Sequence, residues 1–112
     1  MQVLITKADL DLLRKNSDET GAAILAGRDT PEHRPVIKLF SGPATWLITE
    51  IDEDLDRMFG LCDLGLGEPE LGYVSLAEIK AVPGLERDRY FRPDRTLSQY
   101  AALARLKGRI VA

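Results

Sequence analysis

Short apolar runs separated by tight breaks fill the middle of the 112-residue chain and restrict the folds that it can adopt. The runs cover residues 36–40, 45–51, 58–64 and 71–74, and their pattern is typical of strands. The breaks at 41–43, 52–54 and 65–69 are too short for the crossover, about a dozen residues, that parallel strands require. The runs therefore predict an antiparallel sheet of four strands, with residues 86–91 as a candidate fifth.

Two of the predicted strands carry apolar side chains on both of their alternating faces. In the second strand, a period of two places Leu47 and Ile51 on one face and Trp46 and Ile48 on the other. Strands that are apolar on both faces are typical of a sheet covered on both sides. We therefore expect both faces of this sheet to be covered.

Three helix starts share one capping chemistry, a hydroxyl residue followed three positions later by a residue that can bond back to the free amides. The pairs are Thr6 with Asp9, Ser75 with Glu78, and Thr96 with Gln99. They predict an N-terminal helix, a short middle helix over 76–81 and a C-terminal helix over 97–106. The apolar stripe of the last helix is expected to contain Tyr100, Leu103 and Leu106.

Residues 17–34 are interrupted by Gly21, Gly27 and Pro31, which predicts a short helix followed by a mobile loop. At 112 residues, with 45% hydrophobic and 29% charged residues, the chain matches ordinary globular composition. We therefore predict one α+β domain over residues 1–112.

Charge and cysteine content exclude some classes of protein. The net charge of -3 is too small for a polyanion that mimics DNA and has the wrong sign for binding nucleic acid by overall charge. The single cysteine, Cys62, cannot form an internal disulfide, which favours the cytoplasm. No stretch approaches the roughly 18 apolar residues of a membrane span, and the N-terminus lacks the apolar core of a secretion signal.

Several sequence blocks resemble an uncharacterised bacterial family, the domain of unknown function 2958 (DUF2958). They lie at residues 36–40, 44–50, 59–65, 70–76 and 84–88, with Phe91 following. The resemblance implies a small intracellular bacterial protein of a family often carried on plasmids and integrative elements, and it implies no reaction. The leading hypothesis is therefore a non-catalytic accessory or protein-binding module, with no cofactor, that acts through a protein partner.

Acidic residues are the first alternative source of function. The run Asp52-x-Asp54-x-Asp56, with Asp63 at the twelfth position, imitates a calcium loop but has Arg57 where the turn needs glycine. A second set of carboxylates lies at strand ends and, if brought together, could hold a divalent metal for an enzyme. Its members are Glu50, Glu70, Glu86 and Asp88. Pairing with nearby arginines is the competing interpretation, and we assign no metal site.

Basic residues are the second alternative. Residues 87–112 contain seven Lys or Arg and two Asp, a charge of 7 − 2 = +5, whereas residues 1–86 carry 8 − 16 = -8. The candidate nucleic-acid contacts are Arg87, Arg89, Arg92 and Arg95. The competing interpretation is charge pairing within the fold.

The remaining candidates are isolated residues. Trp46 and Tyr73 are large aromatics that could anchor a partner, although we expect both in the core. His33, the only histidine, lies between Pro31 and Pro35 and is predicted to be an exposed loop residue. Cys62 lies within an apolar strand, where a buried inert thiol is expected. No catalytic residue is therefore assigned.

Overall fold

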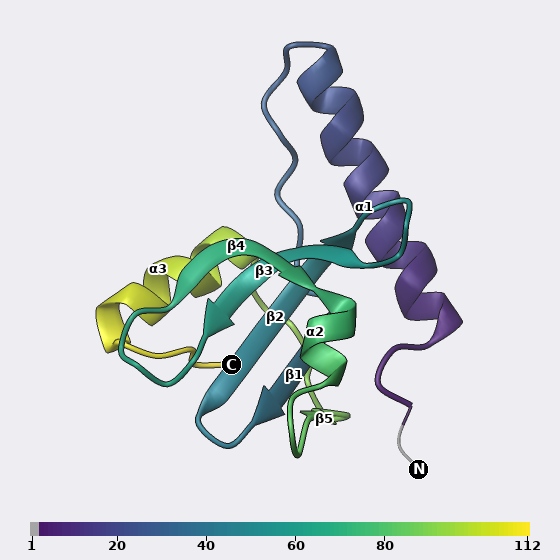
Figure 1. Ribbon diagram of the computed structural model, residues 1–112. Coiled ribbons are helices and arrows are strands. Elements are labelled where there is room, and N and C mark those ends of the chain that lie inside the picture. The colour runs from purple at the N-terminus through teal and green to yellow at the C-terminus, as the bar shows by residue number, and fades with distance from the viewer. Residues whose placement is uncertain (1–2) are drawn as a thin grey trace.

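The computed structural model, which describes residues 3–112, contains a five-stranded antiparallel sheet in the order β4-β3-β2-β1-β5 (Figure 1). The strands are β1 (Ile37–Ser41), β2 (Ala44–Ile51), β3 (Arg57–Asp63), β4 (Glu70–Ser75) and β5 (Glu86–Arg87). Each of the first three strands pairs with the next strand along the chain, because the short connections leave no other arrangement, and β5 pairs with β1. The predicted α+β class and antiparallel sheet are confirmed.

The three predicted helices are present as α1 (Lys7–Leu25), α2 (Leu76–Lys80) and α3 (Leu97–Lys107). Thr6 and Thr96 form complete capping boxes with Asp9 and Gln99, and the Ser75 hydroxyl accepts the Glu78 amide. At the other end of α3, Gly108 adopts a left-handed conformation with φ of 74°, which a side chain would disfavour. The helix boundaries thus follow from local capping chemistry.

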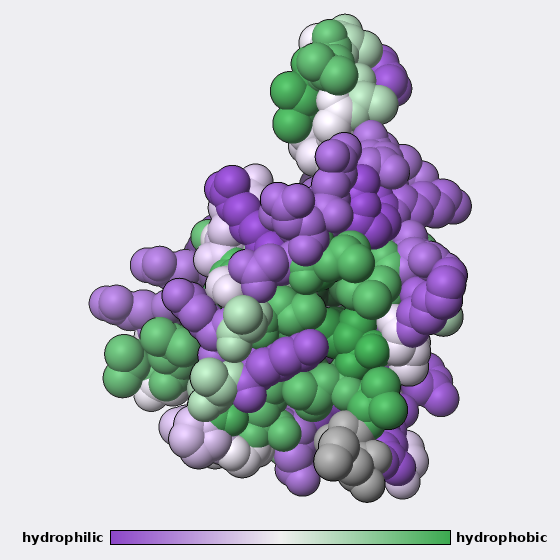
Figure 2. Space-filling view, turned by 45° about the vertical axis from the view of Figure 1, so that its right-hand side comes forward, coloured by the Kyte–Doolittle hydropathy of each residue, from purple (hydrophilic) through white to green (hydrophobic). Residues whose placement is uncertain are grey.

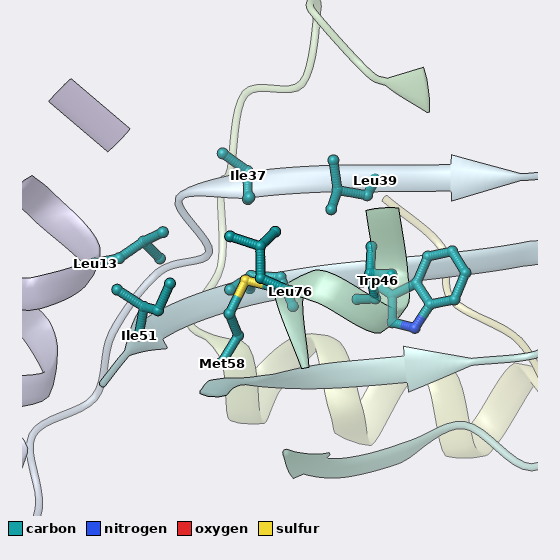
Figure 3. Packing of buried hydrophobic residues seen from close by; sticks show 9 residues of the cluster. Leu13, Ile37, Leu39, Trp46, Ile51, Met58 and Leu76 are labelled. Atoms are coloured by element: carbon teal, nitrogen blue, oxygen red, sulfur yellow. The ribbon is translucent and has the colours of Figure 1, made fainter. Parts of the chain in front are cut away.

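Helices cover both faces of the sheet, as the apolar strands predict. On one face α1 and α2 pack on a cluster that includes Leu13, Ile37, Trp46 and Met58 (Figure 3). On the opposite face α3 packs on Leu47 and other residues of the second cluster. Leu47 and Ile48 are both fully buried although they point to opposite faces.

Of the short helix and mobile loop predicted over residues 17–34, the separate short helix is wrong, a loop is present after Leu25, and its mobility stays a prediction. α1 runs without a break through Gly21 to Leu25, and an extended segment then returns to β1. One glycine inside a helix costs only about 1 kcal/mol, which the packing of Asn16 and Ala23 on the same helix offsets. We call residues 17–34 the arm, because its upper part projects from the body of the molecule (Figure 1).

The tip of the arm is apolar. Ile24 and Leu25 are exposed at 62% and 91%, and Figure 2 shows hydrophobic side chains at this projecting end. Beyond the tip, the return segment is attached to α3: the His33 carbonyl accepts the Leu97 amide at 2.8 Å, and Ser98 donates to Glu32. The arm is therefore fastened at its base.

Two further predictions are corrected by side-chain chemistry. The candidate strand over 86–91 ends at Arg87, because the Asp88 carboxylate accepts the Tyr90 amide and turns the chain. The buried face of α3 contains Leu97, Tyr100, Ala101 and Ala104. Leu106, predicted on the stripe, is 79% exposed, because the helix packs on the sheet through its small alanines.

Within residues 3–112, no helix has the length and apolar character needed to cross a bilayer.

Candidate functional site

A groove lies between the arm and the sheet. Its main hollow has a volume of about 310 Å³ and receives side chains from six segments. Among them are Thr20 of α1, His33 of the return segment, Glu50 of β2, Phe59 of β3, Tyr73 of β4 and Ser98 of α3. A second hollow of about 230 Å³ shares Thr20, Ile24, Glu50, Phe59 and Tyr73 with the first, and we call the two together the arm groove.

A β-bulge directs Glu50 into the arm groove. Ile48 pairs with Gly60 of β3, but Glu50 pairs with Phe59, so Thr49 is an extra residue in β2. One extra residue reverses the alternation of side chains beyond it. Ile51 consequently joins the cluster of Trp46 and Ile48, which corrects the predicted placement with Leu47, and Glu50 lies on the other face, beside Phe59.

Side chains of α1 hold the bulged end of β2. Asn16, itself buried, donates to the Thr49 carbonyl at 3.0 Å, and Arg14 donates to the Ile51 carbonyl at 2.9 Å. The Thr49 hydroxyl donates to the Phe59 carbonyl across the strands. These bonds satisfy backbone groups that the bulge removes from regular pairing, and they fix α1 beside Glu50.

Glu50 is half-buried and is linked to the arm by a short polar chain. The Thr20 hydroxyl donates to Glu50 Oε2 at 3.0 Å and lies 3.4 Å from His33 Nε2. Burial raises the pKa of Glu50 above 4.5, and the hydrogen bond from Thr20 and the charge of His33 oppose this shift only in part. A carboxylate with a raised pKa in a groove is a typical feature of a binding or catalytic site.

His33 is not the exposed loop residue that was predicted, since only 10% of its side chain is exposed. Its Nδ1 lies 3.9 Å from Glu19, so Thr20, His33 and Glu19 follow the order of a hydrolase triad. These three residues do not form a working triad, because the Thr20 hydroxyl donates its only proton to Glu50. Thr20 also lies inside α1, where the neighbouring amides are engaged in the helix and cannot hold an oxyanion.

The other wall of the arm groove is aromatic. Phe59 and Tyr73 meet edge to face with their ring centroids 5.1 Å apart, and the Arg57 guanidinium lies 3.9 Å from the centroid of Tyr73. Tyr73 is 62% exposed, so its predicted place in the core is wrong. Trp46 is only 5% exposed and belongs to the core, as expected, so it does not offer a surface to a partner.

β4, which carries Tyr73, is an edge strand. It pairs only with β3, and its exposed residues Leu71 and Tyr73 both line the arm groove. The six residues of β4 include no lysine or proline, and the one charged residue among them is Glu70 at the start of the strand. The groove thus borders a strand that is free to pair.

The four candidate carboxylates lie apart from one another. Glu70 on β4 and Glu86 on β5 lie at opposite edges of the sheet, and Asp88 pairs with Lys38 at 3.4 Å. Only Glu50 lies in the arm groove. Residues 3–112 contain no group of three or more acidic, histidine or cysteine side chains placed to hold a metal ion. These four carboxylates therefore do not converge on one site in the described part of the chain.

Two other residues of interest in the sequence have structural roles. Asp63 is buried and accepts the amides of Ile110 and Gly65, which fastens the C-terminal tail to β3. Burial, together with the charge of Glu70, raises the pKa of Cys62 to about 11, so the thiol stays protonated and inert near neutrality.

The four candidate arginines are in different environments. Arg87 points into the molecule, where it pairs with Asp9 and donates to the Leu4 carbonyl. Arg95 lies 3.4 Å from Asp94, and Arg92 donates to the Phe91 carbonyl. Arg89 is exposed. Arg87 is therefore part of the fold, and nucleic-acid binding by the others stays a prediction.

Sequence reasoning identified Glu50 and Tyr73 but missed the residues that surround them. Thr20, His33 and Phe59 come from segments that only the folded chain brings together. The one available signal was the position of Phe59 and Tyr73 on neighbouring strands, which is typical of an aromatic cross-strand pair. The arm groove as a whole carried no motif.

A protein-family model described as "Protein of unknown function (DUF2958)" matches residues 4–111. No curated protein and no solved structure matches the chain.

Proposed function

The chain belongs to the DUF2958 family, and we propose that it is a non-catalytic protein-binding module whose partner pairs with the open edge of β4. Pairing of an extended segment with an exposed sheet edge is a common mode of peptide recognition. In this mode, backbone hydrogen bonds supply affinity and neighbouring pockets supply specificity.

The observation that supports this proposal most directly is the contrast between the two edges of the sheet. β5 is only two residues long, and the Asp88 turn follows it at once. β4 has six residues, carries exposed Leu71 and Tyr73, and borders the arm groove. Proteins usually protect long apolar edges, so an edge that carries a charge only at its first residue, Glu70, and borders a groove is typical of an interface.

The polar groups of the arm groove favour binding over catalysis. Thr20 donates to Glu50, and Ser98 donates to Glu32, so both hydroxyls are held in internal hydrogen bonds. A nucleophile would need a base positioned to take its proton. Bacterial origin, carriage on mobile elements and a cytoplasmic location accompany the proposal as predictions from the family resemblance.

A displayed peptide library selected against the full chain tests the proposal. We expect the selected peptides to protect the amides of β4 from hydrogen exchange and to shift the NMR signals of Leu71 and Tyr73. Tyr73→Ala should weaken their binding roughly tenfold or more, as expected for an aromatic anchor. Tyr90→Ala is the matched control, because Tyr90 is 88% exposed and lies outside the arm groove.

Peptides that leave β4 unprotected, or that bind Tyr73→Ala and the parent chain equally, would overturn the proposal. A selection that yields no binding peptide at all would count against it as well. Both variants change an exposed side chain, so their folding can be verified by thermal unfolding before binding is compared.

A further inference from the structure

We infer that the arm groove receives a lysine or arginine side chain from the segment that pairs with β4. The inference rests on the proposed function and names the chemistry of the partner. It assigns to Glu50 the role of binding the partner's cationic group.

The charge of the main hollow favours a cation. Glu32 and Glu50 line it, and none of its lining residues in the described chain is a lysine or arginine. Glu19 stands just behind His33. An incoming basic side chain therefore meets the negative charge of Glu32 and Glu50, which its own charge complements, and Arg57 lines the second hollow of the arm groove but not this one.

The carboxylate of Glu50 retains a free acceptor. Within residues 3–112, the one side chain that hydrogen-bonds to it is Thr20, which donates to Oε2. Oε1 is therefore available to a donor from outside the chain. A charge-assisted bond from an ammonium or guanidinium to a half-buried carboxylate is stronger than a neutral hydrogen bond. It would also offset the cost that burial imposes on the charged form of Glu50.

The aromatic wall suits the same group. A cation is attracted to the face of an aromatic ring within about 6 Å of its centroid. Arg57 of the same chain already lies 3.9 Å from the centroid of Tyr73, so a cation from the partner would share this wall with it. Phe59 and Tyr73 also provide apolar surface for the methylene groups of a long basic side chain. The groove thus combines a carboxylate with aromatic rings, and an acidic or short polar side chain would complement neither the carboxylate nor the rings.

The test uses small probes that do not depend on strand pairing. Nα-acetyl-arginine methylamide and its neutral isostere, the citrulline derivative, are titrated into the full chain and followed by NMR. We expect the arginine probe to bind roughly tenfold more tightly, with shifts at Glu50, Phe59 and Tyr73. Glu50→Gln should abolish this preference, whereas Glu68→Gln, which removes the same charge from an exposed loop, should preserve it.

Equal binding of the arginine and citrulline probes would overturn the inference, as would a preference that persists in Glu50→Gln. These results are distinct from failure of the proposed function. If selected peptides protect β4 while the two probes bind equally, the cation site is wrong and strand pairing stands. If the arginine probe binds at Glu50 while no peptide protects β4, strand pairing is wrong.

Discussion

At the scale of single residues, the burial of the Glu50 carboxylate lowers the stability of the folded chain. A carboxylate exposed to water would keep its ordinary pKa, but the bulge at Thr49 places Glu50 half-buried beside Phe59. Burial instead raises the pKa of Glu50, which means that the folded protein binds a proton there more tightly than the unfolded chain does. A group that costs stability and faces a groove is typical of a functional position.

The pH dependence of stability should report this cost. The free energy of unfolding should fall as the pH rises from 4.5 through the higher folded pKa of Glu50. Glu50→Gln keeps an acceptor for Thr20 and has no proton to lose, so this fall should disappear. Urea denaturation at about pH 4 and about pH 7 measures the difference, with Glu68→Gln as the exposed control. The prediction fails if Glu50→Gln has the same pH dependence as the parent chain.

At the scale of elements, the close approach of β2 and β3 depends on one glycine. A Cβ added at Gly60 would lie 2.1 Å from the Leu47 carbonyl oxygen, which belongs to the backbone and cannot move aside. A Cβ added at Gly72, the partner of Gly60 on β4, would meet no atom within 4 Å. In this cross-strand pair, Gly60 therefore leaves no space for a side chain, whereas Gly72 does.

Alanine substitutions at these two glycines should separate the effects. Gly60→Ala is expected to lower the free energy of unfolding by about 3 kcal/mol, because the strands must part to admit the methyl group. Gly72→Ala should change it by less than about 1 kcal/mol, since the space is open. Urea denaturation of both variants makes the comparison. Equal losses in the free energy of unfolding would show that the contact with the Leu47 carbonyl does not set the cost of adding a methyl group.

At the scale of the whole molecule, opposite charges connect the N-terminal helix α1 to the edge strand β5. The negative first part and the positive last part meet where Arg87 pairs with Asp9, 78 residues earlier. Nearby, Lys38 contacts Asp88 and donates to the Ala112 carbonyl. Part of the basic character of the C-terminal region is therefore used inside the fold.

Asp9→Asn should release this connection. Burial alone would raise the pKa of Asp9, but hydrogen bonds from Arg87 and Thr6 outweigh it and lower the pKa below 3.8. The pair therefore stabilises the fold above pH 3.8, and its contribution is lost as the pH falls through the folded pKa. We expect a loss of about 2 kcal/mol near neutral pH that shrinks on acidification.

Asp11→Asn is the matched control for this change. Asp11 pairs with Lys7 on the same helix, and both side chains are largely exposed, so its loss should have little effect. Thermal and urea unfolding of both variants over a range of acidic to neutral pH measures the difference. Similar losses in the two variants would contradict a special role for the pair between Asp9 and Arg87.

The candidate site was predicted only in fragments. Glu50 and Tyr73 were chosen from the sequence, but for a carboxylate cluster and a partner anchor that were considered separately. The bulge at Thr49 brings Glu50 into the same groove as Tyr73. The apolar pattern of β2 does not indicate an extra residue. The arm was also missed, because a single glycine such as Gly21 does not destabilise a helix enough to end it when packing holds that helix in place.

The sequence by itself determined the elements whose causes are local. Capping residues set the starts of the helices, and short turns imposed antiparallel pairing on the first four strands, because these interactions join neighbours along the chain. Only the tertiary structure decided which edge of the sheet stays open and which residue pairs with Arg87. It also decided that Thr20, His33 and Glu50 share a groove. Those features depend on contacts between residues far apart in sequence, and they are settled by packing and burial.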